Sequence, residues 1–178
     1  MLRLPIHERT SFVLVRPHYP ENVGAAARAI KTMGFTELVL VKPGRMAGPD
    51  HVMARKMAVK SWDVLESARL CATLDEALAE ASLVVATTSR RGMSGVRTAR
   101  AAATMIEQHV AGGGSAAIVF GNEKSGLSEL DLGRARERLR IPMAADQPSI
   151  NLGQAVQLVA YELLLAGLEA RTRAQRAP

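Results

Sequence analysis

Apolar residues along the chain alternate between two kinds of pattern. Short continuous runs rich in β-branched residues predict strands that are buried on both faces. These runs cover residues 11–16, 37–42, 82–88 and 115–120, with a weaker one at 139–142. Between them apolar residues recur every three or four positions, which predicts helices over 21–33, 74–80, 96–110 and 151–168.

The regular alternation of strands and helices predicts an α/β fold. Right-handed crossovers should join parallel strands and place helices on both faces, which gives a three-layer sandwich around a mostly parallel sheet. Residues 43–61 contain glycines and prolines without a strong period, so we expect an irregular excursion with one short helix. We expect one domain over residues 1–170, followed at 171–178 by a frayed basic tail or the start of a further segment.

The last predicted helix has two apolar sides. One stripe consists of Leu152, Ala155, Val156, Val159, Leu163 and Leu168, and the second of Leu158, Tyr161 and Leu165. One stripe is enough to dock a helix on a sheet, so the second indicates a partner surface, most simply that of a symmetric homodimer. The alternative is a helix buried on both sides within its own domain.

Composition limits the class of protein. A chain of 178 residues is long enough to bury a core without disulfides or metal, and its only cysteine, Cys71, is expected to be a small core residue. Charges interrupt the N-terminus before an apolar segment can form, and no run approaches the ~18 apolar residues of a membrane span. We therefore expect a soluble cytoplasmic protein without a membrane partner.

The charge of the chain favours a polyanionic partner. The net charge is +6 and the pI is about 10.1, while aromatic residues make up only 3%, which argues against a single-strand binder built on stacked rings. Basic residues gather at Arg90, Arg91, Arg97 and Arg100 and alternate at Arg134, Arg136, Arg138 and Arg140. The first cluster, in particular Arg90, Arg91 and Arg97, is the preferred RNA contact, and ordinary solvated charge is the alternative.

Several familiar chemistries lack their motifs. His7, His18, His51 and His109 are scattered without ligand spacing, so no metal site is expected. The stretch after Gly121 lacks the spacing of a nucleoside-triphosphate loop, and neither a G-x-G-x-x-G turn nor a G-x-S-x-G elbow is present. Triphosphatase, dehydrogenase and serine hydrolase functions therefore lose their usual support.

Three stretches combine small residues with polar groups at boundaries between strands and helices. They are residues 22–28, residues 120–127, and residues 141–143 together with 149–152. Ligands of open α/β sheets bind at such strand ends. Gly121 would let a ligand approach the backbone, and Ile141, Met143 and Ile150 could enclose an apolar ring. The residues alone predict a site for an adenine-like ligand.

The same stretches resemble, in order and spacing, the motifs of the TrmH-type 2′-O-ribose branch of the SPOUT superfamily of RNA methyltransferases, most closely its bacterial tRNA 2′-O-methyltransferases. The matching motifs are Asn22-x-Gly24-x-x-x-Arg28, Phe120-Gly-Asn-Glu-Lys-Ser-Gly-Leu127, and Ile141-Pro-Met143 with Ser149-Ile-Asn-Leu152 and Tyr161-Glu162. The resemblance runs from about residue 11 to residue 162. It implies a deep trefoil knot in the C-terminal half, S-adenosylmethionine as cofactor, and a homodimer whose active site takes residues from both chains.

The resemblance also implies roles for individual residues. Cofactor contacts are expected from Thr88, Ser89, Gly121, Ile141, Pro148, Ser149, Ile150 and Asn151, and the catalytic set is Arg28, Asn22 and Glu123. Arg28 with Asn22 would face the RNA ribose, and Glu123 would contact RNA or hold the knot loops. Asn22 is equally well explained as a helix N-cap, and Ser149 and Asn151 as turn and cap residues.

The implied function is transfer of a methyl group from S-adenosylmethionine to a ribose 2′-OH of tRNA, at nucleotide 32 of the anticodon loop. Alternatives are wobble nucleotide 34, rRNA, or a non-catalytic RNA-binding module. Arg28 is a poor general base because an arginine pKa exceeds ~12, so orienting the ribose or stabilising the oxyanion suits it better. The chain departs from the family pattern at Gly153, where many relatives carry serine, and it stops at Pro178, where relatives continue into a helical extension.

Overall fold

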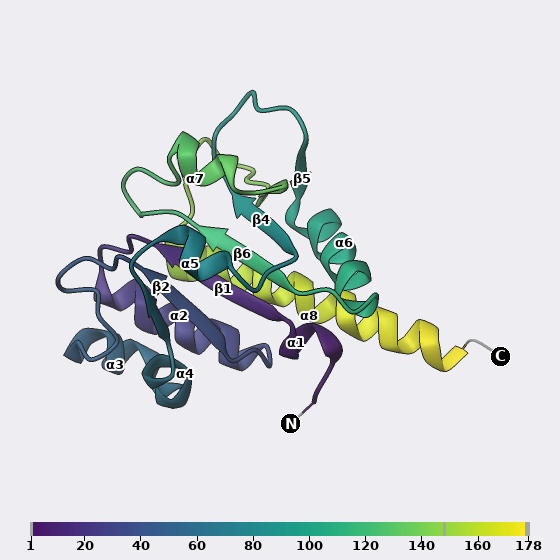
Figure 1. Ribbon diagram of the computed structural model, residues 1–178, viewed down its shortest axis with the longest axis horizontal. Coiled ribbons are helices and arrows are strands. Elements are labelled where there is room, and N and C mark those ends of the chain that lie inside the picture. The colour runs from purple at the N-terminus through teal and green to yellow at the C-terminus, as the bar shows by residue number, and fades with distance from the viewer. Residues whose placement is uncertain (1, 148, 177–178) are drawn as a thin grey trace.

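A computed structural model describes residues 2–147 and 149–176 (Figure 1). Seven strands form one parallel sheet in the order β3-β2-β1-β6-β4-β7-β5. The strands are β1 (Thr10–Val15), β2 (Glu37–Val41), β3 (Arg69–Cys71), β4 (Leu83–Thr87), β5 (Val96–Thr98), β6 (Ala116–Phe120) and β7 (Glu137–Arg140). The five predicted strands are confirmed to within a few residues at each end.

Helices cover both faces of the sheet, which confirms the three-layer α/β architecture. The helices are α1 (Pro5–Glu8), α2 (Pro20–Thr32), α3 (Val52–Ala58), α4 (Trp62–Glu66), α5 (Leu74–Leu78), α6 (Ala99–Ala111), α7 (Glu129–Gly133) and α8 (Leu152–Arg176). One face packs against α2, α6 and α8 with the shorter α1, α3 and α4, and the other against α5 and α7. In Figure 1 the yellow α8 runs behind the sheet while α5 lies in front of it.

Strand alternation explains how one short sequence supplies both layers. Within β1, Phe12 and Leu14 belong to the core on the α8 side, whereas Val13 and Val15 belong to the core on the α5 side, and all four are fully buried. Phe12 packs edge-on to Phe35, with 5.1 Å between ring centroids. Continuous hydrophobicity in this strand thus follows from burial on two faces.

Two short edge strands, the short helices α1, α4 and α7, and two helix ends differ from the sequence prediction. The predicted helix at 96–110 begins only at α6, because Thr98 Oγ1 accepts a hydrogen bond from Ala101 N (3.2 Å) and Val96–Thr98 pairs with β7. Residues 171–176, predicted as a basic tail or the start of a further segment, are helical and continue α8. Thr172 Oγ1 bonds Leu168 O (3.0 Å) and Arg173 lies 3.8 Å from Glu107, so contacts with the helix itself and with α6 support this last turn and a half.

The second apolar stripe of α8 is open to solvent in the single chain. Leu158 is 42% exposed and Tyr161 46% exposed, so the alternative of a helix buried on both sides is wrong. Cys71 is buried, as expected, and burial raises the pKa of its thiol. Over residues 2–147 and 149–176 the structure contains no helix that is both long and apolar enough to cross a membrane.

Candidate active site

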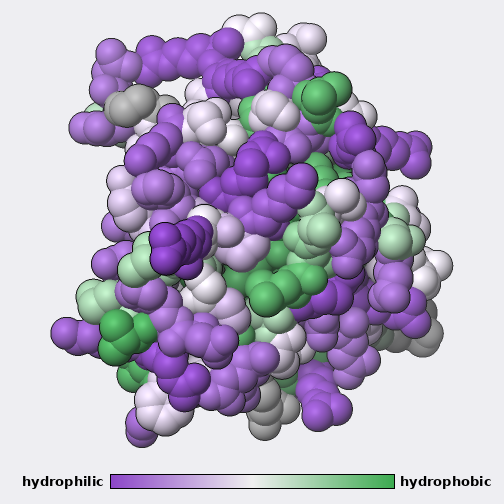
Figure 2. All heavy atoms as spheres, turned by 60° about the vertical axis from the view of Figure 1, so that its left-hand side comes forward, coloured by the Kyte–Doolittle hydropathy of each residue, from purple (hydrophilic) through white to green (hydrophobic). Residues whose placement is uncertain are grey.

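A cavity of about 450 Å³ opens at the carboxyl ends of β4, β6 and β7. Its walls come from residues 87–90, 120–127, 139–143 and 149–155, together with Tyr19 and Asn22 from the start of α2. Figure 2 turns the left-hand side of Figure 1 toward the viewer and shows hydrophobic atoms in the middle of this face, ringed by hydrophilic side chains. The cavity size lies within the usual range for small-molecule sites.

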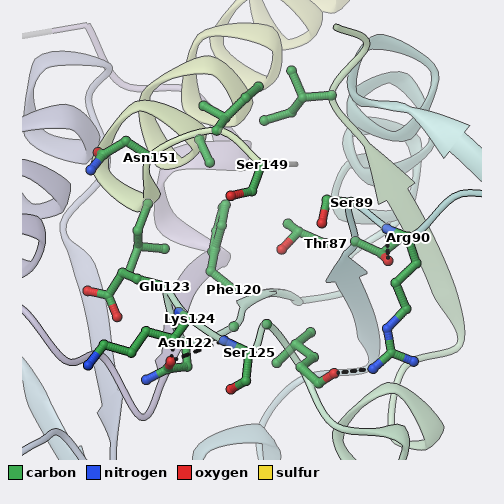
Figure 3. A pocket seen from close by; sticks show the side chains of 18 of the residues that line it. Thr87, Ser89, Arg90, Phe120, Asn122, Glu123, Lys124, Ser125, Ser149 and Asn151 are labelled. Atoms are coloured by element: carbon green, nitrogen blue, oxygen red, sulfur yellow. Dashed lines mark hydrogen bonds between the residues drawn. The ribbon is translucent and has the colours of Figure 1, made fainter. Parts of the chain in front are cut away.

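Most residues predicted to touch a cofactor line this cavity. They are Thr88, Ser89, Gly121, Ile141, Ser149, Ile150 and Asn151, while Pro148 lies outside the described residues. In Figure 3 Asn151 and Glu123 stand on one side of the cavity and Ser89 and Arg90 on the other. The fold therefore brings segments from three crossovers to one place, as the strand-end argument predicted.

The predicted catalytic residues separate into two groups. Asn22 and Glu123 line the cavity, but Arg28 does not, and its side chain is exposed on α2. No described side chain forms a hydrogen bond or ion pair with the Arg28 guanidinium. Among the described residues, the one side-chain hydrogen bond that involves Arg28 is that from Thr32 Oγ1 to its backbone carbonyl oxygen. Within one chain, Arg28 therefore stands apart from the cavity.

One hydrogen-bonded chain of side chains joins all three sequence motifs. Asn151 Nδ2 donates to Asn22 Oδ1 (2.9 Å), and Asn22 Nδ2 donates to Glu123 Oε1 (2.9 Å). The Glu123 carboxylate also accepts hydrogen bonds from the backbone amides of His18 (2.8 Å) and Tyr19 (3.1 Å). The start of α2, the loop after β6 and the start of α8 are thereby fixed to one another.

This network decides between the two explanations offered for the asparagines. Tyr19, not Asn22, is the N-cap of α2, and Asn22 is its third residue, so the capping explanation for Asn22 is wrong. Asn151 does cap, because its Oδ1 accepts a hydrogen bond from Gln154 N (3.3 Å) at the first turn of α8. The Asn22 side chain is free of capping and links the two polar neighbours on either side of it.

Glu123 is held as a carboxylate. Burial raises the pKa of its carboxyl group, but the hydrogen bonds from Asn22, His18 and Tyr19 outweigh burial and lower the pKa below its ordinary value of 4.5. A carboxylate with three donors is a fixed acceptor rather than a proton donor near neutral pH. Of the two roles expected for Glu123, holding the loops is the one that its contacts support.

The same contacts predict how stability depends on pH. Because the folded-state pKa of Glu123 is lowered, its contribution is present above pH 4.5 and is lost as the pH falls through the folded-state value. Glu123→Gln should therefore lower the free energy of unfolding by about 1–2 kcal/mol at pH 7 and flatten its decline between pH 5 and pH 3. Urea unfolding at several pH values measures both effects.

The control is Glu80→Gln, since Glu80 is exposed and its carboxylate has no hydrogen-bond partner in the described part of the chain. Glu80→Gln should show the same dependence of the free energy of unfolding on pH as the wild type. An unchanged pH profile in Glu123→Gln would contradict the loop-holding role. Part of the decline in the free energy of unfolding at low pH should remain in both variants, because the Asp131 carboxyl accepts hydrogen bonds from Arg16 and Ser128 and its pKa is also lowered.

Gly121 lines the cavity and also lets two parts of the chain approach each other. A Cβ atom there would lie 2.3 Å from the carbonyl carbon of Gly126 and 2.4 Å from Leu127 N, so only a glycine leaves room for the backbone of residues 126–127. Asn122 closes the same loop: its Oδ1 accepts Lys124 N (2.9 Å), its Nδ2 donates to Arg16 O, and its carbonyl accepts Gly126 N (2.8 Å). These contacts fix the shape of the cavity wall.

Gly24 and Gly153 serve helix packing. A Cβ on Gly24 would lie 2.0 Å from Ala54 O, so this glycine lets α2 and α3 touch. Gly153 faces Ala25 of α2, whose Cβ would stand 2.7 Å from an added Cβ. The departure at Gly153 therefore concerns the contact between α2 and α8.

The arginine cluster is less basic than its sequence indicates. Arg90 pairs with Glu129, Arg91 with Asp146, Arg97 with Glu137 and Arg100 with Glu162. Of the three preferred RNA contacts, only Arg90 lines the cavity, where it also donates to Leu127 O (2.8 Å). Arg91 and Arg97 each use one guanidinium nitrogen in these ion pairs, so their other N–H donors can still contact RNA.

The cavity combines an apolar wall with directed polar groups. Leu139, Ile141 and Ile150 offer apolar surface, and the hydroxyl groups of Thr88 and Ser89 lie at the end of β4. Among the described residues, no group of three or more histidine, cysteine, aspartate or glutamate side chains is placed to hold a metal ion. The arrangement suits a ligand with a flat apolar ring and several polar atoms.

Comparison with known proteins agrees with this architecture. A model of the SpoU rRNA Methylase family matches residues 9–161. The chain is 38% identical to the tRNA (cytidine/uridine/adenosine-2′-O-)-methyltransferase TrmJ of Pseudomonas aeruginosa over 92% of this chain and 63% of that protein. It is 39% identical to the uncharacterized tRNA/rRNA methyltransferase LasT of Escherichia coli over 87% of this chain and 68% of LasT.

Among solved structures, that of a probable methyltransferase from Bordetella pertussis Tohama I superposes with a TM-score of 0.85 at 40% identity. The match covers 89% of this chain and 95% of that one. The chain thus spans about two thirds of the length of the two curated relatives but nearly all of this structural neighbour.

Proposed function

The chain belongs to the SpoU rRNA Methylase family, and we propose that it is an S-adenosylmethionine-dependent enzyme that methylates a ribose 2′-OH of tRNA. The observation that carries the proposal is the hydrogen-bonded chain from Asn151 through Asn22 to Glu123, which assembles all three motifs around one cavity. The named relative TrmJ acts on tRNA 2′-hydroxyl groups, which supports tRNA as the substrate.

The residues of the cavity fit the proposed cofactor. Leu139, Ile141 and Ile150 would enclose an adenine ring, while Thr88, Ser89 and Asn151 supply polar atoms for its sugar and amino-acid parts. When bound, S-adenosylmethionine supplies a methyl group activated by a sulfonium centre. Isothermal calorimetry would detect binding, and the absence of heat would favour the non-catalytic RNA-binding alternative.

The work left to the protein is positioning. The 2′-oxygen must be held in line with the methyl group, and its proton must leave. Arg28 would orient the ribose and stabilise the developing negative charge, while water takes the proton, since a guanidinium does not accept one. Asn22 and Glu123 line the same cavity and keep the loop after β6 in place for this step.

The exposed position of Arg28 supports a shared site. Because Arg28 lies outside the cavity of its own chain, we propose that it enters the cavity of a partner subunit in a homodimer. The open stripe on α8 with Leu158 and Tyr161 is the surface through which the subunits would meet. Arg28, which has no ion-pair partner among the described residues, lies on the same helix as Asn22, six residues further along α2.

A charge placed in the open stripe should separate the subunits. Leu158→Glu is expected to convert a species of twice 19.1 kDa into a monomer, because the carboxylate would lose its hydration at the interface. Size-exclusion chromatography with light scattering at micromolar concentration measures the mass. Leu130→Glu is the matched control, since Leu130 is a 75% exposed leucine on α7. A wild-type monomer would remove the dimer proposal.

We also propose that the C-terminal half is knotted. Residues 139–152 line the same cavity as residues 87–90 and 120–127, so the segment from β7 to α8 runs beside both loops. That proximity is what a chain threaded through its own loops requires. The proposed site of action is the cytoplasm, where tRNA is available, and Arg90, Arg91 and Arg97 remain the proposed RNA contacts.

Nucleotide 32 of the anticodon loop is the proposed target. The likeness to TrmJ supports 2′-O-methylation of tRNA, the choice of nucleotide 32 rests on the resemblance of the sequence motifs alone, and methylation of nucleotide 34 or of rRNA is the competing outcome. Mass spectrometry of tRNA and rRNA from a deletion strain would identify the lost 2′-O-methyl nucleotide. Loss from nucleotide 34 or from rRNA alone would replace the proposed target while leaving the reaction type intact.

A further inference from the structure

Aromatic side chains are scarce in this protein, and one of them stands at the cavity. The three phenylalanines are fully buried or nearly so, whereas Tyr19, Trp62 and Tyr161 are 44%, 51% and 46% exposed. Of these three exposed rings, only Tyr19 lines the cavity. An exposed ring beside a ligand cavity is a surface on which a second flat group can stack.

The Tyr19 ring has basic neighbours. Lys124 Nζ lies over the ring, 5.6 Å from its centroid, and the His18 ring meets it edge-on with 4.7 Å between centroids. Lys124 Nζ is also 3.1 Å from His18 Nε2. A flat apolar surface is thus combined with a cation within a few ångströms, which suits a group that carries both a ring and a phosphate.

The backbone of Tyr19 is fixed before any ligand arrives. Its amide and that of His18 donate to the Glu123 carboxylate, and its carbonyl accepts Asn22 N (3.1 Å) as the N-cap of α2. Pro20 follows directly and restricts the chain further. A ring held in this way loses little conformational freedom when another ring stacks on it.

We propose that Tyr19 stacks on the unpaired nucleobase of the nucleotide whose ribose is methylated, and that Lys124 with His18 contacts its phosphate. The inference rests on the proposed function. A ribose that enters the cavity must carry its base out of the RNA stack, and extruded bases are commonly received by aromatic side chains. Tyr19 stands next to Asn22 and Glu123, on the side of the cavity formed by α2 and the loop after β6.

Position within the cavity distinguishes the base from the cofactor. The apolar wall of Leu139, Ile141 and Ile150 comes from β7 and from the segment leading into α8, whereas Tyr19 precedes α2. Two separate flat surfaces can receive two flat groups. The adenine takes the first surface and the target base takes the second, so changes at Tyr19 should affect RNA and leave cofactor binding alone.

The test compares Tyr19→Leu and Tyr19→Trp with a matched control, Trp62→Leu. Trp62 is also exposed and also lies under a cation, with Arg55 5.7 Å from its ring centroid, but it does not line the cavity. The measurements are the Kd of an unfractionated tRNA pool at fixed salt, the KM for that pool, and the Kd of S-adenosylmethionine by calorimetry. Thermal melts check that each variant is folded.

Tyr19→Leu should weaken tRNA binding and raise KM by about 5- to 100-fold, because one stacked base is lost. Tyr19→Trp, which keeps a ring, should stay within about threefold of wild type by the same argument, as should Trp62→Leu. All variants should bind S-adenosylmethionine as wild type does. The Trp variant keeps the test valid even if the leucine variant folds poorly.

Three outcomes would overturn the inference. They are wild-type tRNA affinity in Tyr19→Leu, equal losses in Tyr19→Leu and Trp62→Leu, and a loss of S-adenosylmethionine binding in Tyr19→Leu, which would place the ring against the cofactor. Failure of the proposed function is a different result, in which wild-type protein transfers no methyl group to any RNA. If the wild type methylates tRNA and Tyr19→Leu does so equally well, only the stacking by Tyr19 is refuted and the proposed function stands.

Discussion

Arg28→Ala should lower the rate of methyl transfer to tRNA by a factor on the order of 10²–10³ or abolish it, because a charged donor to the developing oxyanion is removed. The Kd of S-adenosylmethionine should stay near wild type, since the proposed contact of Arg28 in the partner's cavity is with the ribose and not with the cofactor. Stability should also be unchanged, because the side chain is exposed and no described residue pairs with it. Single-turnover methylation and calorimetry measure the two effects.

Arg45→Ala is a suitable control, since Arg45 is another exposed arginine outside the cavity. It should keep wild-type turnover. Arg28→Lys should recover part of the activity, because it keeps the charge but loses the planar fork of donors. Retained turnover in Arg28→Ala would remove Arg28 from the catalytic step, and a parallel loss of cofactor binding would place it in the cofactor site instead.

Gly121→Ala should be the most destabilising single change in the site. The added Cβ would lie 2.3 Å from one backbone atom and 2.4 Å from another, and neither can move without opening the loop that Asn122 closes. We expect a loss of about 3 kcal/mol or more in the free energy of unfolding, and a melting temperature lower by roughly 6–12 °C. Cofactor binding should be lost with the loop geometry.

Gly133→Ala provides the matched comparison, since an added Cβ there meets no atom within 4 Å. It should leave the melting temperature unchanged or raise it slightly, because alanine restricts the unfolded chain. If Gly121→Ala had the melting temperature of the wild type and bound S-adenosylmethionine with the same Kd, the contact between Gly121 and residues 126–127 would not shape the cavity.

The sequence predicted the central sheet and the placement of the site, and the reasons are local. Strands such as β1 are buried on both faces and therefore read as continuous apolar runs, and parallel strands necessarily bring their carboxyl ends to one edge. The short edge strands β3 and β5 could not be predicted in this way. Arg69–Cys71 and Val96–Thr98 are too short and too polar to carry a period, and neighbouring strands impose their conformation.

The sequence predicted which segments line the candidate site but not which side chains contact one another there. Motif positions placed Ser149 and Asn151 at the cavity, but the partner of each polar group depends on contacts across more than 100 residues, as between Asn22 and Glu123. The contact of Gly121 with residues 126–127 could not be predicted, because the sequence does not reveal which backbone approaches it. The arginine cluster was judged too basic for the same reason, since Glu137 and Asp146 lie 40 and 55 residues from Arg97 and Arg91.

Tyr19 carried no signal in the sequence. The low aromatic content of 3%, with two tyrosines in the chain, argues against stacking as a general binding mode, and only the place of Tyr19 at the cavity beside Lys124 makes it a candidate. Recognising the ring required the geometry of the loop after β6.

The most direct measurement is to incubate unmodified tRNA with the protein and methyl-labelled S-adenosylmethionine, digest the RNA to nucleosides, and identify the labelled product by mass spectrometry. We predict a labelled 2′-O-methyl nucleoside, formed by the wild type and lost in Arg28→Ala. Label on a base, or no transfer to tRNA by a wild-type protein that is folded and binds the cofactor, would contradict the proposed function.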